Sequence, residues 1–424
     1  MILGLLSAAA LAVALLTLAR SALLFVFASR HARTPRAPRV DAAAGVSVVV
    51  PAFNEAVVIE ETVRALAAST YSLLEIVVVD DGSTDGTAAV VDRLGLSCVR
   101  VVRQPNSGKA GALNTAIALA RHDIIVSVDA DTVFEPETVA ILVDALAVPG
   151  VGAVAGNTKV ANRDRRVGRW QHVEYVIGFN LDRRLYDVLG CMPTVPGAVG
   201  AFRRCALEDV GLFSADTLAE DTDVTIALAR AGWRVAYAAH AIAHTEAPTS
   251  VRGLWRQRVR WTRGTLQSVS KHRAALQHGG QGHIGRRGLP YLIVYHVIVA
   301  VLAPSIDLLA VYGVLSVGVL RTAGWLIAFN TPAVAIAAYA FRVDGESLRP
   351  LWGLPAQQFA QRQLMCLIVA RSMLGALFGT EMVWHRSIRA GEARSSPPSR
   401  RRAARTAVAS DSSRPVGLPP ATPR

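Results

Sequence analysis

Two pairs of carboxylates follow short apolar runs, each at a point where a strand is expected to give way to a turn. Asp80 and Asp81 lie in VVVDDGSTDG, ahead of a glycine turn, and Asp129 and Asp131 end the run DIIVSVDAD. Ligands of open α/β sheets bind outside the carboxyl ends of strands, so all four carboxylates are expected in one crevice. There Asp80 and Asp81 could accept hydrogen bonds from a base or a ribose. Asp129 and Asp131 offer hard oxygen ligands to a divalent metal, Mg²⁺ or Mn²⁺, that also holds a diphosphate.

Both motifs have structural alternatives. Asp81 and Ser83 could merely cap a helix that begins near Asp85, because short oxygen-bearing side chains are preferred at helix starts. A DxD triplet is also common in surface turns, and only its apolar lead-in favours a metal site. For Asp81 the two interpretations stay open.

Lys109 is one of only three lysines and stands between glycines in NSGKAGALN, ahead of an apolar helical stretch. The spacing of a Walker A loop is absent, so the lysine is better interpreted as a diphosphate contact than as the lysine of an NTPase. A solvated surface lysine is the alternative.

Three acids, Glu220, Asp221 and Asp223, stand at the start of an expected amphipathic helix in TLAEDTDVTIALARAGW. One of them could be a general base, because attack by an alcohol requires proton removal by a group within hydrogen-bond reach. Acids are also favoured near helix N-termini by the helix dipole, which accounts for at least one of the three.

The run RQRVRW places two arginines beside an indole, just before the apolar C-terminal blocks. Arg258 and Arg260 can bind diphosphate oxygens in a bidentate manner. Trp261 could stack on a sugar face, or it could be an aromatic residue of the membrane interface, as Trp255 could.

Short β-branched runs alternate with amphipathic stretches between about residues 44 and 250. This pattern predicts an α/β fold with a mostly parallel sheet flanked by helices. Hydrophobicity is continuous within each run, so the strands are expected to be covered on both faces. The expected strands are 46–51, 75–81, 98–103, 123–131 and 151–156.

Apolar segments lie at both ends of the chain. The stretch 2–29 is interrupted only by Arg20 and is long enough to cross a hydrocarbon core of about 30 Å. Beyond residue 285, three apolar blocks could each span, at 289–319, 323–341 and 359–380. The predicted units are a transmembrane helix (1–29), a basic cytosolic linker (30–43), a catalytic domain (44–250), an interfacial helical segment with QRVRW (251–285), a C-terminal transmembrane region (286–385) and a disordered basic tail (386–424).

The composition agrees with a membrane protein, since 52% of the 424 residues are hydrophobic and only 18% are charged. The net charge of +13 comes almost wholly from arginine beside apolar segments and in the tail, which favours a membrane surface and excludes nucleic acid as the expected partner. The cysteines form no CxxC pair, which suits a reduced cytosolic domain. They are Cys98, Cys191, Cys205 and Cys366.

The number of apolar blocks conflicts with the positive-inside rule. One N-terminal and three C-terminal spans would leave the arginine-rich tail outside the cell. Either the 289–319 block is broken at Pro304 into a short hairpin, or one C-terminal block lies in the interface. We expect a cytosolic tail.

Seven motifs follow one another in the order seen in family 2 glycosyltransferases: VPAFNE, VVVDDGS, GKAGALN, DAD, GAFRR, TLAED and QRVRW. The chain resembles this family over most of its length, and within it the bacterial poly-β-1,6-N-acetylglucosamine synthases and, more distantly, cellulose and hyaluronan synthases. In two respects it departs from the pattern. Ala219 stands where many relatives have threonine, and no PilZ-like domain follows, so regulation by a cyclic dinucleotide through such a domain is not expected.

The resemblance implies a GT-A fold (mostly parallel sheet flanked by helices) with transmembrane α-helices at both ends. In such a fold Glu55, Asp80 and Asp81 would contact uridine. Asp129 and Asp131 would hold the nucleotide and the metal.

By the same resemblance Asp221 would be the catalytic base. The set Gln257, Arg258, Arg260 and Trp261 would bind the donor diphosphate and the acceptor sugar at the entrance to a translocation path. In related polymerases this motif accompanies processive elongation.

Residues and resemblance together predict a metal-dependent, inverting enzyme of the cell membrane, multi-pass, with its catalytic domain in the cytosol. Asp221 would activate an acceptor hydroxyl, while the metal, Lys109 and Arg260 stabilise the departing UDP. The donor would be a UDP-sugar, with N-acetylglucosamine expected, and the acceptor a growing β-linked polysaccharide. A non-processive enzyme with a lipid acceptor is the alternative, and a catalytically idle nucleotide-sugar sensor a weaker one. A small membrane partner or an export component could accompany the enzyme.

Overall fold

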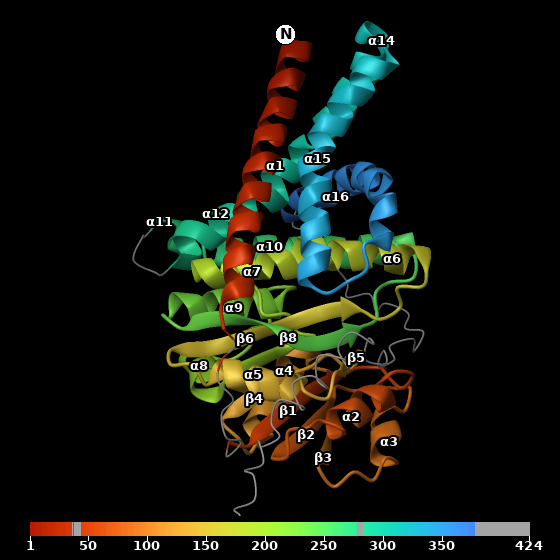
Figure 1. Cartoon of the computed structure of the whole chain (residues 1–424). Coiled ribbons are helices and arrows are strands. Elements are labelled where there is room, and N and C mark those ends of the chain that lie inside the picture. The colour runs from red at the N-terminus through yellow and green to blue at the C-terminus, as the bar shows by residue number, and fades with distance from the viewer. Residues whose placement is uncertain (36, 38–43, 278–282, 378–424) are drawn as a thin grey trace, which may run out of the picture.

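The computed structural model describes residues 1–35, 37, 44–277 and 283–377, which form two tiers (Figure 1). An α/β unit built on one sheet makes the lower tier of this view, and long apolar helices rise from it. The tail predicted at 386–424 lies outside the described residues, and the linker predicted at 30–43 is described only in part.

One mixed sheet of eight strands lies at the centre of the lower tier, in the order β3-β2-β1-β4-β7-β6-β8-β5. Strands β1 to β4 pair in parallel, β7 runs antiparallel between β4 and β6, β8 is parallel to β6, and β5 is antiparallel to β8. The strands are β1 Val46–Ala52, β2 Leu74–Asp80, β3 Val99–Arg103, β4 Ile124–Ser127, β5 Thr132–Phe134, β6 Val151–Val160, β7 Gly200–Arg203 and β8 Arg234–Thr245.

The five predicted strands are present within a few residues of their expected bounds. Every residue of β1 is buried, as its continuous apolar run predicts. Three strands were not predicted, and one of them, β5, has only three residues. β7 has only four residues, and β8 is rich in alanine, which is depleted in strands.

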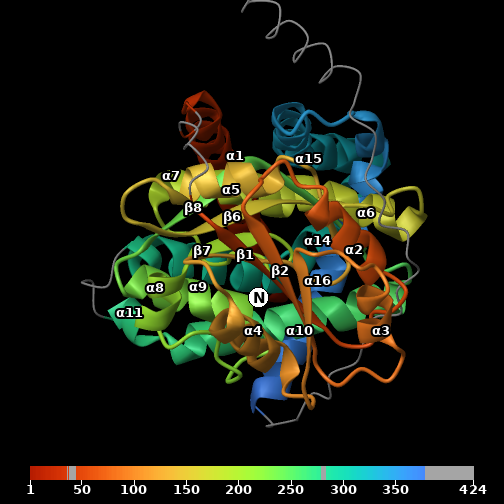
Figure 2. The same ribbon diagram turned by 90° about the horizontal axis from the view of Figure 1, so that it is seen from below.

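Helices cover both faces of the sheet, which confirms the predicted α/β fold of the GT-A kind; Figure 2 shows strands β1 and β2 from below, with helices around them. Helices α2, α3 and α5 contribute to one core, and α4, α7, α8 and α9 to the other. Their bounds are α2 Ile59–Ala67, α3 Thr87–Asp92, α4 Gly108–Leu119, α5 Thr138–Leu146, α6 Arg166–Glu174, π-helix η1 Tyr175–Asn180, α7 Leu181–Leu189, α8 Arg204–Asp209 and α9 Glu220–Arg230.

The rest of the described chain is helical and forms the upper tier with the N-terminal helix. Its elements are α1 Ile2–Arg33, α10 Val251–Lys271, α11 Ala274–Gln277, η2 Ile284–Gly288, α12 Leu289–Leu292, η3 Ile293–Ile298, α13 Val299–Leu302, α14 Pro304–Val317, α15 Val319–Val343, η4 Arg349–Gly353 and α16 Leu354–Leu377. Helix α10 lies between the sheet and the long helices (Figure 1). Its start is capped by Ser250, whose hydroxyl accepts a 3.1 Å hydrogen bond from the N–H of Gly253.

Three helices in the described ranges are long and apolar enough to cross a membrane: Leu3–Arg33, Ile284–Val317 and Val319–Val343. The second stays helical through Ala303 and Pro304, so no hairpin forms there. The block predicted at 359–380 falls largely on α16, which is not one of the three and which packs against α10 and α13.

An ionic contact attaches α1 to the lower tier. Arg20, the one charge within its apolar run, lies 2.7 Å from Asp182 on α7 and donates a 3.0 Å hydrogen bond to the hydroxyl of Tyr291 on α12. Tyr291 in turn donates to Asp182 over 2.9 Å. The arginine that interrupts the apolar N-terminus therefore faces protein rather than lipid.

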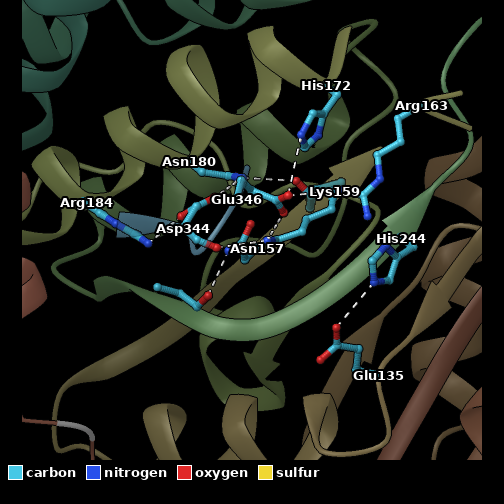
Figure 3. Close-up of polar contacts among 12 residues, drawn as sticks. Glu135, Asn157, Lys159, Arg163, His172, Asn180, Arg184, His244, Asp344 and Glu346 are labelled. Atoms are coloured by element: carbon cyan, nitrogen blue, oxygen red, sulfur yellow. Dashed lines mark hydrogen bonds and ion pairs between the residues drawn. The ribbon is translucent and has the colours of Figure 1, made fainter. Parts of the chain in front are cut away.

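A buried polar junction attaches the turn after α15 to the sheet (Figure 3). Glu346 Oε1 lies 2.6 Å from Lys159 Nζ on β6, and Oε2 lies 3.2 Å from Arg163 and 3.7 Å from His172 on α6. Burial lowers the pKa of His172 to about 4; Glu346 opposes this, and the charges of Arg163 and Lys159 add to it. His172 is therefore neutral in the folded protein at neutral pH.

The same turn carries a second buried carboxylate. Asp344 Oδ1 accepts a 2.6 Å hydrogen bond from Arg184 on α7, and Oδ2 accepts one of 3.2 Å from Asn180 (Figure 3). Removing one partner of a buried ion pair commonly costs about 3–5 kcal/mol. These contacts therefore hold the end of α15 firmly against the sheet.

We expect acid to destabilise the protein through His172. The unfolded chain takes up a proton at the ordinary histidine pKa of 6.5, whereas the folded chain does so only near 4. Neutral His172 therefore contributes its full stabilisation of the folded state above pH 6.5. As the pH falls from 6.5 towards 4, the free energy of unfolding decreases by at most about 1.4 kcal/mol per pH unit. Thermal unfolding of the full chain in detergent should show a weaker dependence on pH in this window for His172→Gln than for wild type. The control His122→Gln, outside the junction, should keep the wild-type dependence; equal slopes for all three proteins would contradict the assignment.

Candidate active site

Lys109 is the centre of a charged cluster at the carboxyl end of β4. Its Nζ lies 2.6 Å from Asp129 Oδ1 and 3.0 Å from Glu220 Oε1. These side chains come from the start of α4, the turn after β4 and the start of α9, so one ammonium joins three elements. The side chains of Lys109 and Asp129 are 29% and 32% exposed, so a ligand can reach both from the open side.

The charges in this cluster change one another's proton affinity. Burial disfavours the ammonium of Lys109, but the carboxylates of Asp129, Glu220 and Asp221 outweigh burial and raise its pKa, so it stays cationic. Burial and then the neighbouring Glu220 raise the pKa of Asp221 from 3.8 to about 6, although Lys109 opposes the shift. A carboxylate with a pKa near 6 is suited to take a proton at neutral pH.

The three acids at the start of α9 have different contacts. Glu220 pairs with the lysine of the cluster. Asp223 lies 2.7 Å from Lys271, at the end of α10, so it ties the two helices together. Asp221 Oδ2 accepts a long hydrogen bond of 3.4 Å from the N–H of Gly197, and among the described residues it makes no ion pair within 4.0 Å. Of the three, Asp221 is the acid best placed to react.

Asp81 orders the loop that leads to Lys109. Its Oδ1 accepts a 2.8 Å hydrogen bond from the N–H of Ser107, and its Oδ2 accepts one of 2.9 Å from the N–H of Gly108. The capping alternative is therefore wrong for the helix that follows Asp81, because α3 begins at Thr87 without a side-chain cap. The carboxylate of Asp81 instead binds main-chain N–H groups at the start of α4.

Asp80 and Glu55 lie where the loops after β2 and β1 meet. Asp80 is buried and its Oδ1 accepts a 2.9 Å hydrogen bond from the N–H of Ser83. The N–H of Glu55 donates to the hydroxyl of Thr87 over 2.8 Å. The two loops are therefore tied together beside the cluster, and the contact of these acids with a uridine stays a prediction.

Asp129 and Asp131 follow β4 and offer hard oxygen ligands, as a divalent metal would need. Asp131 is 3% exposed, and its Oδ1 accepts a hydrogen bond of 3.2 Å from the hydroxyl of Thr132. No group of three His, Cys, Asp or Glu side chains within the described residues could hold a metal ion. Mg²⁺ and similar ions often take one or two carboxylates and complete their shell with water and substrate phosphates. The donor set therefore fits such an ion in company with a diphosphate.

Arg258 of the QRVRW motif points into the protein. It is 4% exposed, lies 2.7 Å from Glu174, and its guanidinium carbon stands 4.4 Å from the ring centroid of Trp261 and 5.5 Å from that of Phe179. The ion pair and the aromatic rings fix this arginine beside the indole of Trp261.

The other members of the motif lie along α10. Trp261 is partly exposed and packs edge-on against Phe179, with ring centroids 5.9 Å apart, and Arg260 is also partly exposed. Gln257 Oε1 and Arg258 Nη1 are buried without a hydrogen-bond partner. Such atoms are uncommon in folded proteins, so both are candidates for contact with a ligand.

Four functional candidates were not predicted from the sequence. Glu174, Tyr175 and Phe179 surround the QRVRW arginine from a segment that includes the π-helix η1, and π-helices are frequent at functional sites. Gly197 lies over the lysine cluster. No motif marks the aromatic segment, whereas the sequence PGA, with glycine after proline, indicates a tight turn at Gly197.

Residues 47–211 match Glycosyl transferase family 2. The match runs from β1 to β7 and includes Asp80, Asp81, Lys109, Asp129 and Asp131, and it ends before Glu220 and Asp221. Among curated proteins it is similar to the poly-beta-1,6-N-acetyl-D-glucosamine synthase of Staphylococcus aureus, 32% identical over 228 residues, which are 53% of this chain and 55% of that protein. The synthase of Staphylococcus epidermidis is 30% identical over 223 residues, which are 52% and 54%. The chain thus spans about half the length of the curated relatives it matches.

Among solved structures the fold is similar to the mannosyltransferase PcManGT from Pyrobaculum calidifontis, in complex with GDP-Man and Mn²⁺. The TM-score is 0.66 and the identity 25%, and the match covers 89% of this chain and 100% of that chain. The likeness therefore includes most of the helical tier as well as the sheet.

We expect Gly197→Ala to lower the sugar-transfer activity that is proposed below by about 10- to 100-fold, because small displacements of a group in an active site cost that much. A Cβ at Gly197 would lie 2.5 Å from Lys109 Nζ and 3.3 Å from Asp129 Oδ1, so the ammonium must shift from its present position beside Asp129. Steady-state kinetics and thermal unfolding would be measured together. Gly353→Ala, where a Cβ meets no atom within 4 Å, is the control. Full activity of Gly197→Ala would show that the Lys109 position is not needed.

Proposed function

We propose that the chain transfers a sugar from a UDP-sugar, with UDP-N-acetylglucosamine as the first donor to test, to a hydroxyl of a growing β-linked polysaccharide, with inversion at the anomeric carbon. The observation that carries the proposal is the cluster at the sheet edge: a cation, Lys109, fixed beside Asp129, and a carboxylate, Asp221, whose pKa is raised to about 6 in the same cluster. A departing diphosphate needs a cation such as Lys109, and an attacking hydroxyl needs a carboxylate such as Asp221 to take its proton.

In the proposed reaction Asp221 accepts the proton of the acceptor hydroxyl as its oxygen bonds to the anomeric carbon. The bond from that carbon to the diphosphate breaks at the same time, and UDP leaves with the electron pair. A single displacement converts an α-linked donor into a β-linked product. Lys109 offsets charge on the departing diphosphate, and Arg260, the partly exposed arginine of QRVRW on α10, is proposed to bind the same diphosphate.

Asp129 and Asp131 would hold a divalent cation, Mg²⁺ or Mn²⁺, which when bound adds positive charge against the diphosphate oxygens. The donor set supports this, since both residues offer carboxylate oxygens at a strand end. Glu55, Asp80 and Asp81 are proposed to contact the nucleoside. Asp81 would make this contact while its carboxylate also accepts the N–H groups of Ser107 and Gly108 and so orders their loop.

We further propose that the three apolar helices cross the cell membrane and that the α/β unit, proposed as the catalytic domain at 44–250, lies in the cytosol. One span before this unit and two after it return the chain to the cytosolic side. The contacts of Glu346 with Lys159 and Arg163 support this count, because the turn after α15 lies against the sheet. Helix α16 would then lie at the membrane interface with α10, and the tail would be cytosolic, as its arginines favour.

A single transfer to a lipid is the second candidate function. The aromatic group of Trp261 and Phe179 near the apolar helices favours elongation, because an indole can stack on each sugar that passes. A catalytically idle sensor of nucleotide sugars is disfavoured by the intact acids of the cluster. Membranes supplied with UDP-N-acetylglucosamine, UDP-glucose and GDP-mannose in turn, followed by linkage analysis of the product, test the donor and the reaction together.

Asp221→Asn should lower transfer by about 100- to 10,000-fold, the usual contribution of a general base, yet leave UDP binding intact. In wild type the rate should rise with pH up to about 6 and then level off, because the base must be deprotonated. Glu220→Gln removes the neighbouring charge that, after burial, raises the pKa of Asp221, so the acid limb of the remaining activity should move to lower pH.

Isothermal titration with UDP and a pH–rate profile measure both effects, with Asp164→Asn as the exposed acid control. Near wild-type turnover of Asp221→Asn would rule out its role as the base.

Trp261→Ala should shorten the products more than it weakens UDP binding, because the indole is proposed to hold the acceptor and not the nucleotide. Product length is measured by gel filtration of radiolabelled polymer at saturating donor. Trp325→Ala, an exposed tryptophan on α15, is the matched control and should leave the product length unchanged. A wild-type product with a single sugar on a lipid would replace the polymerase proposal by the glycolipid one.

A further inference from the structure

A basic groove lies on the side of the molecule away from the proposed active site. Its volume is about 580 Å³, and four arginines line it: Arg30 and Arg33 at the end of α1, Arg234 at the start of β8, and Arg287 at the start of the second apolar helix. Asp187, at the end of α7, is the one acid among its lining residues. The groove therefore carries a positive charge contributed by segments far apart in the sequence.

The charge of the groove is only partly balanced. Asp187 lies 3.6 Å from Arg234 and 3.4 Å from His31, and it also accepts the N–H of Tyr237, so its carboxylate is already engaged. Arg287 donates to a main-chain carbonyl at Leu189 over 3.2 Å.

The two remaining arginines have no such partners. Arg30 and Arg33 are exposed, and within the described residues their side chains make no hydrogen bond and no ion pair within 4.0 Å. Two guanidinium groups therefore remain available to a ligand.

The position of the groove along α1 indicates which ligand can reach it. The outward side of α1 stays apolar as far as Phe25 and Val26, which are 54% and 50% exposed. Arg30 follows Val26 by four residues, or about 6 Å along a helix. The headgroup layer on each side of a bilayer is about 5–8 Å thick. If Val26 lies at the edge of the hydrocarbon, the groove opens at the depth of the lipid phosphates.

We propose that this groove binds the phosphate of an anionic phospholipid from the cytosolic leaflet. Arginine forks bind phosphate oxygens in a bidentate manner, and each arginine near a membrane surface adds to the attraction for anionic lipid. The lipid would join the end of the first apolar helix to the start of the second, on either side of α7. The inference rests on the proposed membrane placement but not on the proposed sugar transfer.

The test is binding of fluorescent phosphatidylglycerol to the purified full chain in neutral detergent. Wild type should bind it saturably, and Arg30→Gln/Arg33→Gln/Arg287→Gln should bind about tenfold or more weakly. Arg64→Gln/Arg93→Gln/Arg121→Gln removes the same charge from the far end of the sheet and should bind as wild type. Unlabelled phosphatidylglycerol should compete, whereas phosphatidylcholine and inorganic phosphate should not. Thermal unfolding of each variant verifies that it is folded.

Three results would overturn the proposal. Wild-type affinity of the groove variant for phosphatidylglycerol would exclude the groove as its site. An equal loss of affinity in the control variant would show attraction by net charge alone. Displacement of the lipid by inorganic phosphate at similar concentrations would show a site for free anions. Extraction of cell membranes with alkaline carbonate is carried out in parallel. A chain released by carbonate would contradict the membrane placement itself, and a retained chain with an unaffected groove variant would contradict only the lipid site.

Discussion

The salt bridge between Lys109 and Asp129 is the interaction on which the rest of the site depends. A lysine among three carboxylates keeps its proton and draws together the starts of two helices and the end of a central strand. Without the ammonium, the carboxylates of Asp129, Glu220 and Asp221 would repel one another, and at least one of them would bind a proton more readily. The same cation keeps the pKa of Asp221 from rising further, so it helps to set the proton affinity of the proposed base.

The second constraint is the attachment of the apolar helices to the α/β unit. A helix surrounded by lipid gains little from the hydrophobic effect when it meets its neighbours, so close packing and polar contacts fix its position. Three such contacts occur along the boundary: Arg20 with Asp182, Glu346 with Lys159, and Arg258 with Glu174. Each joins an element of the upper tier to the sheet or to the helices that cover it. The apolar helices are thus held in a fixed relation to the α/β unit and its charged cluster.

Much of the fold and the order of the motifs could be predicted from the sequence, because continuous apolar runs and terminal acids are local signals. The strands before Asp80 and Asp129 followed from their own residues, and so did the apolar helices. Strand β8 did not, since its alanines become strand only by pairing with β6. The partner of Arg258 could not be predicted either, because Glu174 lies 84 residues away and no local pattern connects them.

The close approach of α10 to the start of α9 links the charged cluster to the helical tier. A Cβ at Gly264 would lie 2.7 Å from the N atom of Ala219 and 2.7 Å from its Cβ, so the two helices touch through a glycine and an alanine. Threonine, which many relatives have where this chain has Ala219, would bring two more heavy atoms to a contact that is already close. The small residue at 219 therefore fits the short distance, and the helix that carries Trp261 lies directly on the turn that presents Glu220 and Asp221. A shift of α10 would move the proposed acceptor platform and the proposed base together.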